Sequence, residues 1–377
     1  MRGRLIVATV LVAVALPSMA SGSVAPAGVA PDAARLGPAE EFPYDNSNAL
    51  VYQLAGSELD LDSASVADEI RDNNTKRNPW FDYGYNSPAV YVADASDELY
   101  TGTCGGEEVR MRFPDRVRSG LGSDSPTVVL NPRRVNDDFD GRPVELRVWR
   151  ARINRDSRTF SAQGCGMFWY NNASTASPEN DGTPFLGHGT GSGVSYLYGL
   201  VRADEVRAGL IPHAVRIAAP SCDFRDGSEP DPFRAPATGT DQRKGQCDEG
   251  DIPPVERRIA MGMRVRLDSA VDCDSRTLPD NPRVNEKREP MLTFLRAMCH
   301  AFQDYGVIVL DGTGVDGFTI YGEGDATARW SRLLGNRDPQ SGYAWALRDE
   351  DTLDDGIQRF GTDGIPWDQW EVMAPEA

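Results

Sequence analysis

The feature of this sequence that most constrains its fold is a series of short runs rich in β-branched and aromatic residues. Glycine, proline, asparagine and aspartate separate each run from the next. Runs bounded in this way are typical of strands joined by turns in an antiparallel sandwich or barrel, so we expect a mainly β chain. The predicted strands are Ala89–Ala93, Glu108–Phe113, Thr127–Leu130, Val144–Ile153, Ala214–Ala219, Met263–Leu267, Gly306–Leu310 and Gly317–Tyr321.

Periodicity refines this expectation. The segment Val144–Ala151 alternates apolar and charged residues, which predicts a strand with one buried and one wet face. Two helices are predicted as well. The short one is Ala203–Ala208, ended by Gly209 in the usual position after a helix, and the longer one runs from Pro290 to Tyr305. We therefore expect a jelly roll or β-sandwich with one long and one short helix packed on the sheets.

The N-terminus predicts export. Arg2 and Arg4 precede the apolar stretch Leu5–Leu16, and small residues at 18–20 resemble a cleavage site. The apolar stretch is shorter than the roughly 20 residues that a membrane-spanning helix needs. We expect a signal peptide over residues 1–20, a flexible leader rich in Ala, Gly, Pro and Ser over residues 21–45, and a single large β-rich domain over residues 46–377.

The six cysteines all follow the predicted cleavage site. An even number of cysteines in an exported chain indicates disulfides. No pair has the Cys-X-X-Cys spacing of a zinc site or a redox motif. Many pairings are possible, and sequential order predicts Cys104–Cys165, Cys222–Cys247 and Cys273–Cys299.

The charge balance disfavours one class of partner. The chain has 39 basic and 57 acidic residues and a formal net charge of −18. A protein that binds DNA or RNA needs a basic surface that releases counterions from the phosphates. We therefore expect no nucleic-acid partner, and the lack of a long apolar segment after the N-terminus predicts no membrane partner either.

Residues 187–193 read GHGTGSG, a glycine run of the kind that cradles phosphates in some proteins. A Walker loop needs a lysine after its glycines, and a dinucleotide fingerprint needs GxGxxG, whereas Gly189, Gly191 and Gly193 alternate. Around Ser195 the GxSxG elbow of esterases is absent as well. We expect a backbone turn that binds no nucleotide, with His188 lining a cleft.

The chain continues with GSG at 191–193, then Ser195, Leu197, GLVR at 199–202, Glu205-Val206, Gly209, Ile211 and HAV at 213–215. This line resembles the motif GSGxSxLxGL[IV]RxxE[IV]xxGxIxHA[LV] of a largely uncharacterised family of secreted actinobacterial proteins, some of which are labelled ATP/GTP-binding. Pro236-Ala237-Thr238 with Asp241, and segments 261–267, 295–312 and 365–373, resemble further blocks of that family. The resemblance covers roughly residues 80–373. It implies a glycan ligand by association only, since members often accompany carbohydrate-binding modules. The insertion between Cys222 and Cys247 departs from the family pattern.

Two residues are candidate catalytic groups. His213 lies on the predicted segment 211–219, and imidazole titrates near neutral pH, as an acid/base group should. The alternative is a core histidine bonded to a neighbouring carbonyl or carboxylate. Asp311 ends an apolar strand, where it would act as a general acid or base with a raised pKa or else hold the following turn. Asp241, Glu323 and Asp325 are its candidate partners.

Substrate contacts are predicted at residues of two kinds. Trp169, Tyr196 and Trp330 offer rings on which a sugar could stack, although aromatic residues of β-proteins usually belong to the core. His188 and Asp241 are polar and lie in or near the predicted turns. We name these five as candidate substrate-binding residues.

One acidic loop resembles half of a calcium site. Asn136, Asp138, Asp140 and Gly141 follow the spacing of the first ligands of an EF-hand, but Arg147 stands where its bidentate glutamate belongs. The loop therefore predicts loosely bound calcium at most, and no other metal or cofactor.

Together these features predict a secreted protein that acts on an extracellular polysaccharide or cell-wall glycan. As an enzyme it would be a glycoside hydrolase or polysaccharide lyase that uses His213 and Asp311 in acid/base roles. The alternatives are a non-catalytic carbohydrate-binding protein and a structural protein of the cell envelope.

Overall fold

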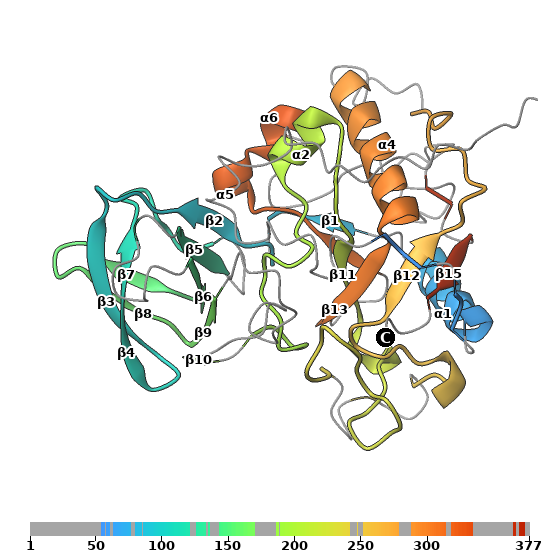
Figure 1. The fold of residues 1–377 in the computed structure, drawn as a ribbon, viewed down its shortest axis with the longest axis horizontal. Helices are drawn as coiled ribbons and strands as arrows, with labels where there is room; N and C mark the ends of the chain where they lie inside the picture. The colour runs from blue at the N-terminus through green and yellow to red at the C-terminus, as the bar shows by residue number, and fades with distance from the viewer. Residues whose placement is uncertain are drawn as a thin grey trace, which may run out of the picture. The chain divides into compact units, whose positions relative to one another are not determined.

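A computed structural model describes residues 54–56, 58–60, 63–76, 80–84, 86–120, 126–132, 135, 143–169, 186–187, 189–241, 247, 252–278, 288–313, 318–334, 365–366 and 369–373 (Figure 1). The predicted signal peptide and leader, residues 1–20 and 21–45, lie outside this set. The chain divides into the units Met1–Pro31 and Asp32–Ala377, and every described residue belongs to the second.

The described part of the chain is mainly β, as predicted, with its strands in three sheets. The six-stranded sheet has the order β1 (Trp80–Asp82), β14 (Thr319–Tyr321), β11 (Val215–Pro220), β13 (Val307–Thr313), β12 (Arg264–Leu267), β15 (Trp370–Val372). The five-stranded sheet has the order β10 (Leu186–Gly187), β9 (Gly164–Trp169), β6 (Val144–Trp149), β5 (Thr127–Asn131), β2 (Ala89–Val92). The four-stranded sheet has the order β4 (Glu107–Phe113), β3 (Glu98–Cys104), β8 (Thr159–Ser161), β7 (Arg152–Asn154).

Strand directions are mixed, which differs from the antiparallel arrangement expected from the turns. β11 pairs in parallel with β13, β2 with β5, and β1 with β14. Parallel neighbours require a long crossover connection, and the chain between β11 and β13 provides one that includes a long helix. The predicted strand Val144–Ile153 is two strands in two sheets, because Arg150 takes a left-handed φ of 52° between them.

Both predicted helices are present. α2 (Ala203–Ala208) ends at Gly209, whose φ of 71° lets its N–H donate to the carbonyls of Glu205 and Val206. α4 (Arg288–Asp304) covers the second prediction. Among the described residues, further helices were not predicted: α1 (Ser63–Lys76), α5 (Asp325–Ala328), α6 (Trp330–Leu334) and the 3-10 helices η7 (Ser221–Asp223) and η8 (Val255–Arg257).

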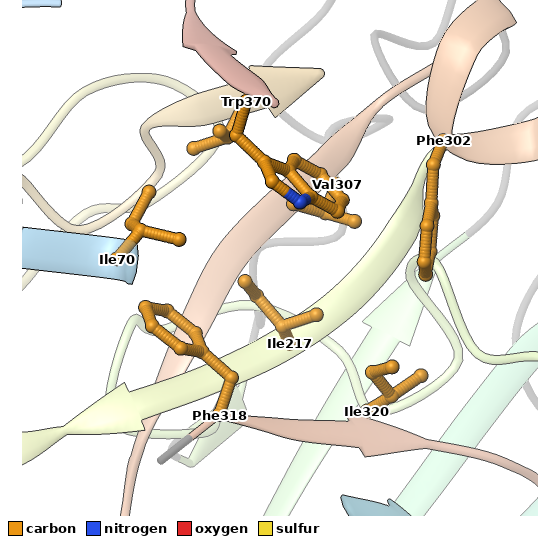
Figure 2. Close-up of a pocket in the computed structure, with 8 residues that line it drawn as sticks. Ile70, Ile217, Phe302, Val307, Phe318, Ile320 and Trp370 are labelled. Atoms are coloured by element: carbon orange, nitrogen blue, oxygen red, sulfur yellow. The ribbon is translucent and has the colours of Figure 1, made fainter. Parts of the chain in front are cut away.

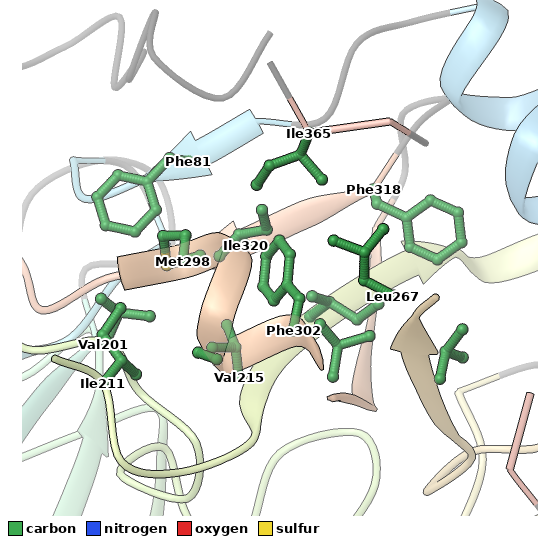
Figure 3. Packing of buried hydrophobic residues seen from close by; sticks show 14 of the residues in the cluster. Phe81, Val201, Ile211, Val215, Leu267, Met298, Phe302, Phe318, Ile320 and Ile365 are labelled. Atoms are coloured by element: carbon green, nitrogen blue, oxygen red, sulfur yellow. The ribbon is translucent and has the colours of Figure 1, made fainter. Parts of the chain in front are cut away.

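The largest hydrophobic cluster joins α4 to one face of the six-stranded sheet. Val215 and Ile217 of β11 and Val307 and Val309 of β13 alternate toward this face, where they pack with α4 residues such as Phe302. Figure 3 shows side chains of α4 and of the strands meeting in this layer. Burying one such side chain contributes roughly 1.5–3 kcal/mol, so this layer is a main source of stability.

A small gap lies within this cluster (Figure 2). Its volume is about 10 Å³, and its lining is entirely hydrophobic: Ile70, Ile217, Val265, Phe302, Val307, Phe318, Ile320 and Trp370. A bound water needs roughly 10–15 Å³ and two or more polar partners. The gap is therefore a packing defect in the core and no ligand site.

The opposite face of the six-stranded sheet looks toward the five-stranded sheet. Val128, Leu130 and Phe168 of the five-stranded sheet share a cluster with Ala218 and Ile308 of the six-stranded sheet, and the segment 194–200 packs among them. The other face of the five-stranded sheet packs on the four-stranded sheet in a third cluster. Sheets that face one another across side chains in this way are consistent with the predicted β-sandwich.

The three predicted disulfides are all confirmed. Cys104–Cys165 joins β3 to β9, Cys222–Cys247 closes the inserted segment, and Cys273–Cys299 ties a loop to α4. Three disulfides fit an oxidising compartment. Among the helices of the described residues, none has both the length and the hydrophobicity to span a membrane.

Candidate functional site

Charged side chains lie on the strand faces between the two larger sheets. Arg216 of β11 and Glu145 of β6 are both 0% exposed, and Arg147 of β6 is buried as well. The sequence pattern had predicted that Glu145 and Arg147 face water, and this is wrong because a second sheet covers that face. Buried charges are unfavourable unless other groups pair with them, so a group of them marks a structured polar site.

A bulge in β13 turns Asp311 toward Arg216. The register between β11 and β13 shifts between Ile217 and Ala218, so that Ala218 lies opposite Asp311 and Leu310 is the extra residue. Regular alternation would have directed Asp311 to the face that α4 covers. Instead, Arg216 Nη2 donates to Asp311 Oδ2 at 2.5 Å. Bulges often redirect a side chain in this way beside an active site.

Asp241 lies against Asp311, and one backbone N–H joins the two carboxyl groups. Gly312 N donates to Asp241 Oδ2 at 2.6 Å and to Asp311 Oδ1 at 3.2 Å. Burial raises the pKa of Asp241 to about 6, and the charge of Asp311 and a hydrogen bond with its carboxyl group contribute to this rise, against the lowering effects of Gly312 and Arg216. The nearby charge of Asp311 therefore disfavours ionisation of Asp241.

The carboxyl pair is only partly buried. The Asp311 side chain is 16% exposed, and Asp241 is also of intermediate exposure. A molecule from solution therefore has access to this pair, in contrast to the fully buried Arg216 behind it. We call Asp241 and Asp311 the carboxyl pair from here on.

The glycine run forms a backbone turn next to Asp241. Thr190 N donates to the Val194 carbonyl at 3.0 Å, and Gly193 N donates to the Thr190 carbonyl at 2.8 Å. A Cβ atom on Gly191 would overlap the Asp241 carboxylate. Gly191 is thus needed for close approach, whereas a positive φ, of 80°, occurs at Gly193.

The turn is also tied to the Pro-Ala-Thr loop that carries Asp241. Thr238 N donates to the Ser192 carbonyl at 2.8 Å, and Thr238 Oγ1 donates to the same carbonyl at 3.4 Å. The two segments that the sequence singled out separately therefore form one structure, and that structure positions Asp241.

Two tyrosine rings pack against the Arg216 guanidinium. Its Cζ atom lies 4.8 Å from the centroid of Tyr196 and 5.1 Å from that of Tyr321. Arg147 lies 4.8 Å from the same Tyr196 ring. Burial raises the pKa of both tyrosines, and that of Tyr321 moves well above its ordinary value. Each cation–π contact contributes roughly 0.5–2 kcal/mol, depending on how far the groups are removed from water.

A short hydrogen bond connects the turn segment to the five-stranded sheet. Ser195 Oγ donates to Glu145 Oε2 at 2.5 Å, and Leu197 N donates to Ser195 Oγ at 2.9 Å. Both Ser195 and Glu145 are fully buried. A substrate cannot reach this serine, so the pair is a structural connection between the turn segment and the five-stranded sheet.

His213 lies in a different network from Asp311. Its Nε2 is 3.1 Å from Glu205 Oε1, and its Nδ1 is 2.9 Å from the Ala214 carbonyl. Burial lowers the pKa of His213, but the charge and hydrogen bond of Glu205 and the Ala214 carbonyl outweigh this effect and raise it overall. His213 is thus the core histidine bonded to a carboxylate and a carbonyl that the sequence left open as an alternative.

A neighbouring ion pair extends that network. Arg202 Nε donates to Glu323 Oε2 at 3.0 Å, and Arg202 N donates to Glu205 Oε2 at 2.8 Å. The network links α2 to the end of β14. Glu323, a candidate partner of Asp311, therefore pairs with Arg202 instead, and Asp241 takes the position beside Asp311.

Trp330 is a core residue. It is fully buried, its ring lies 5.0 Å from that of Phe81 and 6.1 Å from that of Phe294, and its Nε1 donates to the Glu323 carbonyl at 2.5 Å. No face of this ring is left for a sugar, which corrects the expectation that Trp330 binds substrate. Tyr196 is buried too, but it contacts Arg216 at the site.

Several candidates lie outside the described residues: His188, and Asn136, Asp138, Asp140 and Gly141 of the predicted calcium loop. For Trp169 only the backbone position at the end of β9 is described. Within the described ranges, no group of three or more His, Cys, Asp or Glu is placed to hold a metal ion. Comparison with protein-family models, with curated proteins and with solved structures found no match.

Sequence reasoning missed Arg216 and the buried charges of β6. One signal was visible: Arg216 is the single charged residue within the apolar run Val215–Pro220. A charged residue inside a strand that is otherwise buried on both faces needs a partner, and this pattern alone would have made Arg216 a candidate.

Proposed function

We propose that this protein is a secreted enzyme that cleaves an extracellular polysaccharide and uses Asp241 and Asp311 as its acid/base pair. The observation that carries the proposal is the carboxyl pair at the bulge of β13, where one backbone N–H contacts both side chains. An acid/base enzyme needs one group that holds a proton and a second that accepts one near the working pH. The pair replaces His213 and Asp311 in these roles.

The environments of the two carboxyl groups suggest their roles. Asp241 has a pKa raised to about 6, so it retains a proton in mildly acidic medium and would protonate the leaving oxygen of a glycosidic bond. Asp311 receives the salt bridge from Arg216 and would act as the base or nucleophile. In a lyase the same two groups would remove one proton and donate another.

Support for secretion and for a glycan comes from other features. The N-terminal sequence has the pattern of a signal peptide, and the three disulfides fit an oxidising compartment. The substrate class depends on the resemblance to secreted proteins that accompany carbohydrate-binding modules.

Peptide hydrolysis is a second candidate function. The hydrogen bond between the two carboxyl groups favours it, because aspartic proteases use two such groups that share one proton. In that case the pair would activate a water for attack on an amide carbonyl.

The test is turnover by the secreted protein on a panel of neutral and uronic-acid polysaccharides, with casein included. We expect release of reducing ends from one or more polysaccharides. Asp241→Asn and Asp311→Asn should each lower kcat/KM by about 100-fold or more, as is usual when an acid or base is removed. Asp274→Asn is the matched control, since this side chain is 84% exposed and should leave turnover unchanged.

The other outcomes separate the alternatives. Release of new amino groups from casein, lost in the same two variants, would assign peptide hydrolysis in place of glycan cleavage. Retardation in polysaccharide affinity gels without any product would make the protein a binding module. Turnover that survives both substitutions would remove the carboxyl pair from the mechanism.

A further inference from the structure

We propose that Arg216 is a positioning residue that holds Asp311 beside Asp241 in the carboxyl pair. This inference rests on the proposed function for its role in a reaction. The effect of Arg216 on the titration of Asp241 can be measured without a substrate.

Two acceptors, one for each terminal nitrogen, fix the guanidinium of Arg216. Nη2 donates to Asp311 Oδ2 at 2.5 Å, and Nη1 donates to the Ser195 carbonyl at 3.2 Å. Because a guanidinium is planar and rigid, two anchored nitrogens determine the direction of the donor that faces Asp311. A lysine would carry the same charge but could not reproduce both contacts in one plane.

Aromatic rings restrict the remaining movement. Tyr196, from the segment after the glycine run, and Tyr321, from β14, lie 4.8 and 5.1 Å from Arg216 Cζ. The side chain is 0% exposed. Arg216 therefore cannot touch a substrate, and any effect on a reaction must pass through Asp311.

The relative sizes of the effects on the pKa of Asp241 agree with an indirect role for Arg216. Burial and the charge of Asp311 are the largest causes of the raised pKa of Asp241, and the charge of Arg216 is the smallest of those that act on it. Arg216 thus acts mainly by keeping Asp311 in place as the anionic neighbour. Among the described residues, other charged and titratable groups that act at the site include Tyr196, Tyr321, Arg147 of β6 and, acting on Tyr321, Asp82 at the end of β1.

The experiment is a carbon-13 NMR titration of the aspartate carboxyl groups in the whole secreted chain. The signals of the pair are assigned by their loss in Asp241→Asn and Asp311→Asn. In Arg216→Gln we expect the pKa of Asp241 to fall from about 6 toward its ordinary value, because Asp311 is no longer held beside it as the anionic neighbour. In Arg216→Lys, which restores the charge but not the two contacts in one plane, we expect most of this fall to remain.

The matched control is Arg147→Gln. Arg147 contacts the same Tyr196 ring at 4.8 Å and donates to its hydroxyl at 3.4 Å, but its charge is not among the causes that act on Asp241. We expect the pair to titrate as in the wild type. An Arg216→Gln protein whose pair also titrates as in the wild type would overturn the proposal.

Asp311→Asn keeps the inference testable if Arg216→Gln does not fold. With the anionic neighbour removed and Arg216 still present, the pKa of Asp241 should fall from about 6 toward its ordinary value. A pKa that stays near 6 would mean that burial alone sets it, and the inference would be rejected. These titrations need no turnover, so failure to cleave any polymer would reject the proposed function alone.

Discussion

Both faces of the six-stranded sheet are covered by other parts of the chain, but they differ in chemistry. On the face toward α4, β11 and β13 present Val215, Ile217 and Val309 to a purely hydrophobic layer. On the other face the same two strands present Arg216 and, through the bulge, Asp311. Alternation along a strand therefore supplies a core and a polar site from one segment of chain.

The difference teaches that burial has two distinct consequences in this molecule. Burial of hydrophobic side chains stabilises the fold in proportion to the buried apolar area, by about 25 cal/mol per Å², and depends little on the orientation of the groups. Buried charges contribute only when each finds a partner in the right geometry, and loss of one partner costs about 3–5 kcal/mol. The face toward α4 should thus govern the stability of the fold. The face toward the five-stranded sheet, which we call the inner face, should govern the titration of the carboxyl pair.

The largest expected effect is on the α4 face. Phe302→Ala removes a fully buried ring from the core and should lower the free energy of unfolding by about 3–5 kcal/mol, as large-to-small core changes do. Denaturant unfolding followed by circular dichroism would measure it. The pH titration of the carboxyl pair should not change in the protein that remains folded.

Phe233→Ala is the matched control for that substitution. Phe233 is 41% exposed, so its removal should change stability by no more than about 0.5 kcal/mol, as is usual at a surface position. If Phe302→Ala and Phe233→Ala lost the same free energy of unfolding, the assignment of the main core to the α4 face would be contradicted.

The next effect is pH dependence that originates on the inner face. The pKa of Asp241 is raised from 3.8 to about 6, so the folded state binds a proton that the unfolded state releases between these values. Stability should therefore be greatest below pH 3.8 as far as this group is concerned, and should fall as the pH rises toward 6. The loss would reach at most about 3 kcal/mol, because a pKa difference of one between the folded and unfolded states corresponds to about 1.4 kcal/mol.

Asp241→Asn tests the origin of this slope. The variant should lose the decline between pH 4 and 6 in unfolding experiments, because it has no proton to release there. His213 also has a raised pKa, so its contribution is complete below 6.5 and disappears at higher pH, outside this window. A slope that persists in Asp241→Asn would assign the effect to another group.

Much of the fold was predictable because its signals are local. Turn residues located most strands, and helical spacing with a following glycine located α2 and α4. α1 was missed because its stripe is weak, with Val66 and Ile70 as its only buried apolar residues among those whose exposure is described. The parallel pairings, and the second sheet that covers β6, depend on contacts between distant segments, which no local pattern encodes.

The candidate site was partly predictable for the same reason. Asp311, Asp241 and Tyr196 were all named from the sequence, and the structure brings them together around Arg216, although β13 continues past Asp311 to Thr313. Their grouping was not predictable, because it depends on a bulge that redirects Asp311 against the expected alternation. His213 and Trp330 were wrongly assigned to the site, because the sequence does not show the core residues that hydrogen-bond to them. His213 bonds to Glu205 and Trp330 bonds to the Glu323 carbonyl.

The smallest predicted effect concerns the glycine run. Gly191→Ala would place a methyl group where the Asp241 carboxylate lies, and Gly312 N–H restrains that carboxylate from moving aside. Overpacking of this kind costs about 1–3 kcal/mol. If the side chain of Asp241 moves toward solvent, the decline in stability between pH 4 and 6 should weaken in parallel, because burial is the main cause of its raised pKa.

Gly239→Ala is the matched control, in the same loop as Asp241. A Cβ atom there would lie 3.6 Å from the Gly191 carbonyl, an ordinary contact distance, so stability and pH dependence should stay close to those of the wild type. Thermal melts at pH 4 and pH 7 would measure both variants. If Gly191→Ala kept the full pH dependence while losing stability, the turn would support the fold without positioning Asp241, and the glycine run would no longer belong to the site.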